Sequence, residues 1–582
     1  MKSISLVLGS LGLYLATAAY GQTPPDAVNP GTPWPATDGL GRSLPVTSQP
    51  VRPNRCVGIF YFLWHDSLTE HLPNDLAKIL PREPDLLNKP DSPLWGRPAE
   101  PYYWGEPLYG YYNSIDPWVL RRHATLLADA GIDTVIFDTT NRVTYRNVYM
   151  KLCEVWTQVR KEGGRTPRIC FMVNTKAGET ALEIYNDLYK PGLFKDLWFV
   201  WQGKPLMICD LAEATPELAA FFTLRKAHWP FTMVNTHNAW HWETTHPQVF
   251  SYDKSPAEPE QVNVAVAQNL RISDGQVTNM SEGDARGRSF HNGKRDASPG
   301  AANLGLNFAE QWQRARELDP PFVMVTGWNE WIAGRFSRPG RPVVFVDQFD
   351  QEHSRDIEPV TGLHHDNYYY QLVANVRRYK NHPALPVASA AKTIDVSGGF
   401  EQWRDVGPEF MDHAFDNDAR DFGQGERHYV NKSGRNDLVA MKVARDGTNL
   451  YFHARTREPL TPMTDSNWMW LLIDSDQNPK TGWAGYDFII NRTIEGGETW
   501  LEQNTGGWTW KKVAKLDLKV DGSGLMLAVP RKLLGIADGG PIKLDFKWWD
   551  NPRKPGDIMD VYLSGDVAPD GRFNYRYMAE QR

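Results

Sequence analysis

A glutamate between two tryptophans, in the segment Gly327-Trp328-Asn329-Glu330-Trp331, is the feature of this chain best suited to chemistry. It follows the apolar run 321–326, which has the composition of a fully buried strand. A buried carboxylate costs several kcal/mol unless it is paired or protonated. Carbohydrate sites combine a carboxylate for acid, base or nucleophile work, an amide for hydroxyl groups and aromatic faces for sugar rings. The segment therefore favours a carbohydrate site over a Glu that only forms a core salt bridge.

A second carboxyl group is needed, because glycoside hydrolysis normally uses two, about 5–5.5 Å apart for retention or about 6.5–9.5 Å apart for inversion. Asp138, at the end of an apolar run, is the preferred partner of Glu330, although capping the next turn explains this residue nearly as well. Glu352 is chosen from the acidic stretch 347–358, because interleaved aromatic and basic residues suit a structured loop over a cleft. Glu106, on the long first loop, is a third candidate.

The elements that must position these residues alternate between apolar strands and amphipathic helices. Strands are expected at 57–63, 134–137, 169–173, 198–201, 205–209, 231–234, 262–266 and 321–326, and helices at 116–130, 146–161, 179–188, 216–227, 308–318 and 367–379. This order predicts an α/β fold, a (β/α)8 TIM barrel. A doubly wound sheet is disfavoured, because residues 65–68 after the first strand do not form a Gly-rich phosphate loop.

In such a barrel, residues at the C-terminal ends of the strands form the active site. Polar and aromatic residues recur at these ends and on the neighbouring loops. Those expected to bind substrate are Tyr61, Trp64, His65, Trp104, Glu106, Asn174, Asp210, His237, Trp240, Asn329 and Trp331. The set His237, His241 and His246 lacks a carboxylate motif such as H-E-x-x-H, so no cofactor is expected in catalysis.

The N-terminus has the pattern of a signal peptide at residues 1–21. Lys2 precedes an apolar stretch at 4–19, which is followed by small residues, with Gln22 as the expected mature start. The stretch is too short for a confident membrane span, and no Cys follows it for a lipid anchor. The mature protein is therefore expected to be periplasmic or secreted, without membrane insertion.

Composition indicates a large catalytic domain with a smaller one behind it. The chain has 582 residues, 41% hydrophobic and 23% charged, and its net charge of −7 gives no general attraction to nucleic acid. Residues 22–54 read as an extended leader, 55–382 as the barrel and 383–392 as a linker. From 393 to 582 the apolar period changes to two, which predicts an all-β sandwich. The four cysteines fit neither a zinc site nor a disulfide framework.

The Glu330 segment resembles the N-E-W-H-E-G motif of glycoside hydrolase family 99 and its relatives, including family 71-like enzymes. Trp328-Asn329-Glu330-Trp331 carries the likeness, with support from Tyr61, Trp64, the Gly203-Lys204-Pro205 turn and Ile357-Glu358-Pro359. The resemblance implies a (β/α)8 enzyme of the kind that cleaves α-mannans internally. The family places a second Glu three residues after the first, and here that position is Ala333. The resemblance therefore implies a distant branch with another substrate.

The C-terminal region resembles carbohydrate-binding module family 9. The matching residues are Leu472-Ile473-Asp474-Ser475-Asp476-Gln477-Asn478, Lys480-Thr481-Gly482-Trp483 and Gly485-Tyr486-Asp487-Phe488. Asp474, Asp476 and Asn478 alternate as oxygen donors, which suits either a structural calcium site or an ordinary polar turn. The surrounding tryptophans could stack on sugars, although alternate strand positions must face the core.

Together these patterns predict an exported glycoside hydrolase that acts on a polysaccharide or oligosaccharide with carboxylates centred on Glu330. A polysaccharide lyase is one alternative, with arginines at 142, 286, 288 and 295 available to hold a uronate carboxylate. A non-catalytic glycan-binding protein is the other, because the family's second Glu is missing.

Overall fold

The computed structural model describes residues 28–580, except 48, 66–70, 97–100, 339 and 496. The expected signal peptide lies outside the described residues. Within them, eight parallel strands form one sheet in the order β10-β8-β7-β5-β4-β1-β17-β12. Their bounds are β1 Cys56–Tyr61, β4 Thr134–Thr139, β5 Arg168–Val173, β7 Lys204–Ile208, β8 Thr223–His228, β10 Ala239–His241, β12 Gln261–Ala265 and β17 Phe322–Thr326.

This sheet curls into a nearly closed barrel. Among the described residues no backbone ladder joins β10 to β12, but the side chain of Gln261 bridges them. Its Nε2 donates to the carbonyl of His241 at 2.9 Å, and its Oε1 accepts from the same residue's N–H at 2.9 Å. Short strands β9 (Thr236–His237) and β11 (Ser251–Tyr252) extend the sheet beside the first residue of β12.

Helices follow most of the barrel strands. They are α2 Pro117–Asp129, α3 Arg146–Lys161, α4 Ala177–Ile184, α5 Pro216–Phe221, α6 Leu306–Leu318 and α7 Asn367–Lys380. Asp116 caps α2 by accepting from the N–H of Trp118, with Pro117 in the first turn, as the sequence predicts. The described connections from β8 to β10 and from β10 to β12 contain no helix, so the expected (β/α)8 repeat is met only in part.

One predicted helix and one predicted strand are wrong. The helix expected at 216–227 ends at Phe221, and residues 223–228 instead form strand β8. The strand expected at 231–234 is a loop in which Phe231 is 71% exposed. The reason is Arg225, whose guanidinium lies inside the barrel and pairs with Glu260, so that β8 lacks a continuous apolar pattern.

The C-terminal residues form two antiparallel sheets packed face to face. One contains β21 Glu409–Met411, β24 Leu438–Arg445, β25 Asn449–Thr456, β31 Gly524–Pro530 and β30 Leu518–Asp521. The other contains β29 Thr509–Leu516, β28 Glu498–Gly506, β27 Phe488–Glu495, β26 Trp470–Asp474, β32 Ile542–Asp550, β33 Asp566–Ala568 and β34 Tyr575–Ala579. Residues such as Phe452, Leu471 and Phe546 fill the space between them.

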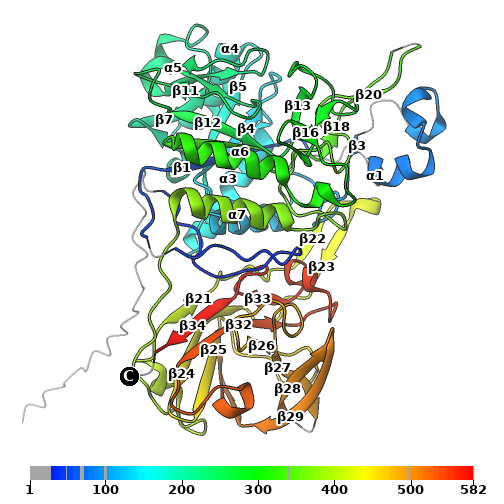
Figure 1. The fold of residues 1–582 in the computed structure, drawn as a ribbon. Helices are drawn as coiled ribbons and strands as arrows, with labels where there is room; N and C mark the ends of the chain where they lie inside the picture. The colour runs from blue at the N-terminus through cyan, green and yellow to red at the C-terminus, as the bar shows by residue number, and fades with distance from the viewer. Residues whose placement is uncertain are drawn as a thin grey trace, which may run out of the picture.

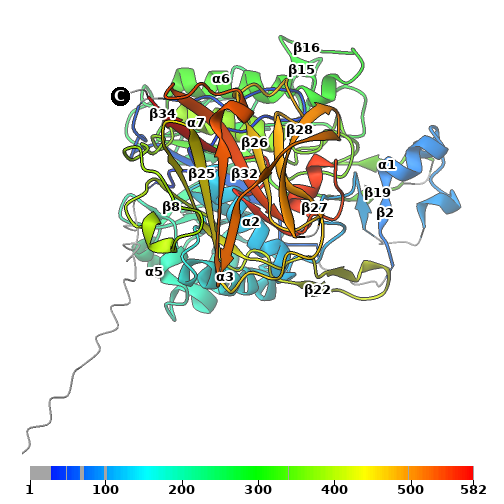
Figure 2. The same cartoon turned by 90° about the horizontal axis from the view of Figure 1, so that it is seen from below.

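The barrel and the β domain share an extensive interface (Figures 1 and 2). Trp470, Trp483 and Trp549 belong to the same hydrophobic cluster as Tyr369 on α7. The leader contributes Trp34, which packs against aromatic rings of the β domain. Trp470, Trp483 and Trp549 are therefore buried in packing and offer no free face for stacking on a sugar.

Ion pairs strengthen the same interface. Arg420 of the β domain pairs with Asp116 at the start of α2 at 2.7 Å. Arg572 pairs with Asp366 just before α7 at 2.6 Å. None of the described helices has the length and apolar character needed to cross a membrane.

Candidate active site

Glu330 lies at the C-terminal end of β17, on a loop held rigidly at the mouth of the barrel. Asn329 fastens this loop to the first strand, because its Oδ1 accepts from the N–H of Phe62 at 2.9 Å. Asp356 accepts a hydrogen bond from the N–H of Glu330 itself. The backbone before and after the carboxylate is thus fixed, as precise placement of a reacting group requires.

Glu330 is 3% exposed, and its carboxyl group lies among polar and charged partners. Its Oε2 accepts from Gln348 Nε2 at 2.7 Å and from Arg355 Nη2 at 2.8 Å. Burial raises the pKa of Glu330 well above its ordinary value, against the lowering effect of Arg355, and Asp347 raises it further. A raised pKa favours the protonated form of a carboxyl group, which is the form that a general acid needs.

Arg355 is the central cation of the site. Its Nη2 lies 2.8 Å from Glu330 and 3.9 Å from Asp347, and its Nη1 lies 3.7 Å from Glu243. The guanidinium also lies over the ring of Trp242, 4.8 Å from the centroid. Three carboxylates therefore converge on one buried guanidinium.

Glu243, immediately after β10, was not among the residues expected from sequence. It is fully buried, and its Oε1 accepts no hydrogen bond. Burial raises its pKa to about 7 despite the nearby Arg355. The sequence predicted a strand at 231–234, which does not form, and a helix where β8 lies. It therefore did not show that Glu243 follows barrel strand β10. Its Oε1 lies 3.7 Å from Arg355 Nη1, so Glu243 belongs to the same buried charge cluster.

Asp347 is the most accessible carboxylate of the group, with 43% of its side chain exposed. Oδ1 of Asp347 lies 3.9 Å from Arg355 Nη2, and Oε2 of Glu330 lies 2.8 Å from the same atom. These two oxygens are therefore no further apart than the sum of the two distances. This upper limit is compatible with the carboxylate separation of retaining glycosidases, about 5–5.5 Å, and excludes most of the range of inverting enzymes, about 6.5–9.5 Å. The acidic stretch 347–358 thus contains a candidate partner of Glu330, but it is Asp347.

Asp138, the preferred partner, lies at the end of β4 and is 6% exposed. Its Oδ1 accepts from the N–H of Thr140 at 3.0 Å, which is the capping role considered as its alternative. Burial raises its pKa, and the negative charge of Asp347 adds to this effect.

Glu352 does not reach this group. Its Oε1 accepts from the hydroxyl of Ser289 at 2.6 Å and lies 3.8 Å from Arg295. Its carboxylate therefore fastens the loop around residues 285–296, and the choice of this residue as catalytic is not supported. Glu106 forms an ion pair with Lys78 at 2.5 Å on the first loop.

Several residues expected to bind sugar are buried in packing instead. Trp104 and Trp331 are fully buried and stack on each other with ring centroids 5.0 Å apart, so neither offers a face to a ligand. Tyr61 points out of the barrel and hydrogen bonds His123 at 2.7 Å. Trp240 is also fully buried, and its Nε1 donates to Glu260 at 2.8 Å.

His237 lies at the wrong end of the barrel. It is exposed on β9, which pairs through β11 with the first residue of β12. The N-terminal ends of the strands lie there, opposite to Glu330. The assignment depended on the predicted strand 231–234, which does not form.

The remaining aromatic and polar residues line the correct end. Trp64 is partly exposed and stacks on Phe62. Trp229, after β8, donates to Oδ1 of the exposed Asn174 at 2.9 Å and packs against Trp242. These rings are the aromatic surfaces that a sugar could reach. Asp210 follows β7 but forms an ion pair with Lys226 at 2.6 Å.

His65 is a buried neutral histidine. It is 1% exposed, and its backbone N–H donates to the hydroxyl of Ser114 at 2.8 Å. Burial lowers the pKa of His65 to about 3, with a further lowering by His123.

The free energy of unfolding should depend on pH because His65 is buried in its neutral form. The unfolded chain protonates His65 near pH 6.5, whereas the folded chain does so only near pH 3, so its stabilising contribution is lost as pH falls between these values. Between pH 7 and 4.5 the wild type should lose up to about 2–3 kcal/mol more unfolding free energy than His65→Gln. Urea unfolding of both proteins at the two pH values measures this difference. Equal losses would show that His65 is not held neutral.

The arginines considered for a lyase have other partners. Arg288 is fully buried and donates to the Asp356 carbonyl at 2.8 Å. Arg295 contacts Glu352 and His353, Arg142 pairs with Glu183, and Arg286 donates to a carbonyl of the neighbouring strand. None of these contacts favours binding of a uronate carboxylate.

In the expected calcium loop of the β domain, one of the three ligands differs between the sequence prediction and the structure. Asp474 and Asp476 each offer an oxygen to a common point, and the third carboxylate there is Asp487. The Asn478 side chain instead accepts from the N–H of Lys480 at 3.2 Å. A structural calcium at Asp474, Asp476 and Asp487 is our proposal for this loop.

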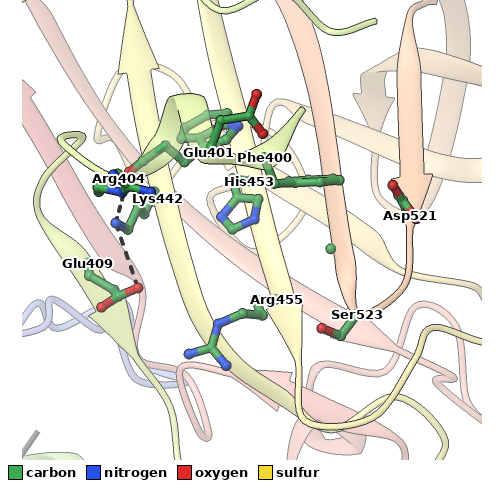
Figure 3. A pocket seen from close by; sticks show the side chains of 11 residues that line it. Phe400, Glu401, Arg404, Glu409, Lys442, His453, Arg455, Asp521 and Ser523 are labelled. Atoms are coloured by element: carbon green, nitrogen blue, oxygen red, sulfur yellow. Dashed lines mark hydrogen bonds and ion pairs between the residues drawn. The ribbon is translucent and has the colours of Figure 1, made fainter. Parts of the chain in front are cut away.

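A separate cavity of about 370 Å³ lies on the outer face of the sheet β21-β24-β25-β31-β30 (Figure 3). Phe400, Trp403 and His453 line it, and Lys442 and Glu409, 3.8 Å apart, lie at its side. None of its lining residues comes from the barrel, so it is not part of the candidate active site.

No protein-family model and no curated protein sequence matches this chain. Similar solved structures include a GH99 endo-α-mannosidase from Bacteroides thetaiotaomicron, which is 13% identical with a TM-score of 0.33 and covers 56% of this chain and 96% of its own. A Thermotoga maritima α-fucosidase is 9% identical with a TM-score of 0.19 and covers 83% of this chain and 93% of its own. These values are too low to assign the chain to either family.

Proposed function

We propose that this protein is a glycoside hydrolase, built on a variant of the (β/α)8 barrel and exported to the periplasm or the medium. The observation that carries the proposal is the pair of carboxyl groups at the barrel mouth, Glu330 buried and Asp347 accessible, on one guanidinium. Aromatic rings surround this mouth, as oligosaccharide binding requires. A polysaccharide or oligosaccharide is the expected substrate.

The two environments suggest separate roles. Glu330, whose pKa is raised by burial, would donate a proton to the leaving oxygen of the glycosidic bond. Asp347, which solvent and substrate reach, would act as the base or the nucleophile. Asp138 would then tune Asp347 through repulsion and hold a sugar hydroxyl. Arg355 would orient both reacting carboxylates without touching the substrate.

A glycan screen tests this function. The wild type and Glu330→Gln are incubated with a broad panel of polysaccharides and oligosaccharides, and the product masses are measured. Release of saccharides at hydrolytic mass by the wild type alone would support the proposal. Products lighter by the mass of one water would indicate a lyase. Equal release by both proteins would remove Glu330 from its role, and glycan binding without any product would favour a non-catalytic binding protein.

A further inference from the structure

A cluster of aspartates lies where the β domain meets the barrel, far along the chain from Glu330. Asp412 directly follows β21, Asp416 lies in the loop after it, and Asp566 begins β33. One carboxylate oxygen from each of the three lies within 4.8 Å of the other two. Asp570 is next to them and shares Arg122 of α2 with Asp416.

Several carboxylate oxygens of this cluster lack hydrogen-bond partners, whereas Asp566 accepts from the backbone N–H groups of Leu438 and Val567. Asp416 is 2% exposed, and neither of its carboxylate oxygens accepts a hydrogen bond. The Oδ2 atoms of Asp412 and Asp570 are also buried without a hydrogen-bond donor. Buried carboxylates are normally paired, hydrogen bonded or bound to a metal, because the alternative is a large desolvation cost.

The neighbouring cations do not balance these carboxylates. Arg122 Nη1 lies 3.8 Å from Asp416 and 3.9 Å from Asp570, beyond hydrogen-bond distance in both cases. Lys547 is fully buried, but it donates to the carbonyl of Pro569. Among the described residues, no cation therefore forms a hydrogen bond with Asp416.

We propose that Asp412, Asp416 and Asp566 bind a calcium ion. Calcium takes oxygen ligands at 2.3–2.6 Å, so two ligands of one ion are separated by at most about 5.2 Å, and the observed oxygens meet this limit. The three ligands are all carboxylates, which favours a hard cation over zinc or copper. Magnesium sites usually use one or two carboxylates with several waters, whereas calcium accepts three or more.

The ion would join parts of the fold that are otherwise separate. β21 belongs to one sheet of the β domain and β33 to the other. Arg122 of the barrel helix α2 lies beside the same carboxylates. Bound calcium would therefore link the two sheets at the surface where they contact the barrel, and it should raise the melting temperature.

Metal analysis of four proteins tests this proposal. The wild type, Asp416→Asn, Asp418→Asn and Asp476→Asn are saturated with calcium chloride, dialysed, and analysed for bound metal by mass spectrometry. Asp418 is an exposed aspartate of the same loop, so its variant is the matched control. Asp476→Asn removes the other calcium candidate. Thermal unfolding of each protein is then measured with calcium and with a chelator.

The expected result is the loss of one calcium per chain in Asp416→Asn and no loss in Asp418→Asn. Asp476→Asn should retain at least one calcium, and the chelator should lower its melting temperature by several degrees. If Asp416→Asn does not fold, the retained metal and chelator response of Asp476→Asn decide the question. The proposal is overturned if Asp476→Asn binds no calcium, if it binds zinc in place of calcium, or if Asp416→Asn binds as much calcium as the wild type.

Discussion

Replacing Asp347 with asparagine is expected to lower kcat by about 10²–10⁴-fold on the substrate that a glycan screen identifies. Asparagine keeps the size of the side chain and removes its ability to accept a proton or attack the sugar. Because 43% of the Asp347 side chain is exposed, its neutralisation should not disturb the fold. Steady-state kinetics and circular dichroism of the variant measure the two effects separately.

Glu352→Gln is the matched control. It neutralises a carboxylate five positions along the same acidic stretch, but that carboxylate contacts Ser289 and Arg295. Its kcat should stay within a few-fold of the wild-type value. If Glu352→Gln is inactive and Asp347→Asn retains activity, the sequence-based choice of Glu352 within the acidic stretch is correct and the proposed pair is wrong. If only Asp138→Asn has a reduced rate, Asp138 would instead be the second catalytic carboxylate.

Replacing Arg355 with methionine is expected to lower the free energy of unfolding by about 3–5 kcal/mol. Arg355 is fully buried and is the cation shared by Glu330, Glu243 and Asp347. Methionine fills part of the same volume but leaves these carboxyl groups without a positive partner. The loss should appear as a lower midpoint in urea unfolding, measured by tryptophan fluorescence at pH 7.

Arg142→Met is the control for this prediction. Arg142 forms an ion pair with Glu183 at the surface, and such pairs contribute little. Its unfolding midpoint should remain close to that of the wild type. A similar small effect in Arg355→Met would mean that the carboxyl groups of the site are already neutral and need no cation. The role of Arg355 would then be limited to orienting Glu330.

The parts of the site that sequence predicted are those that local chain signals determine. The apolar run before Gly327 forms β17, so Glu330 had to lie at a strand end. The run before Asp138 likewise forms β4, and α2 begins at the Asp-Pro pair that predicted it. These elements have regular apolar patterns and clear caps, and both depend on residues close together in the chain.

The missed parts depend on contacts between distant residues. Arg225 inside the barrel is stable only because Glu260 pairs with it, and no local pattern shows that a charged residue will be buried. The strand containing it was therefore read as a helix. That error moved the next strand, placed His237 at the wrong end and concealed Glu243.

The acidic stretch after Glu330 shows the same difference between what local chain signals predict and what contacts between distant residues decide. Its composition alone indicated a structured loop carrying a second carboxylate. Which carboxylate faces Glu330 is decided by Arg355, whose side chain lies between Glu330 and Asp347, while Ser289 holds Glu352 away. Side chains a few positions apart on an irregular loop point in directions that chain spacing does not set.

The tryptophans of the β domain complete the comparison. Their number and the alternation of apolar residues determined that strands with aromatic faces would form. Only the tertiary structure decided that Trp470 and Trp549 share one hydrophobic cluster with residues of the barrel, because alternation specifies two faces but does not identify what covers each one. Hydrophobic burial is not directional, so its partner is chosen by the shape and packing of the whole chain.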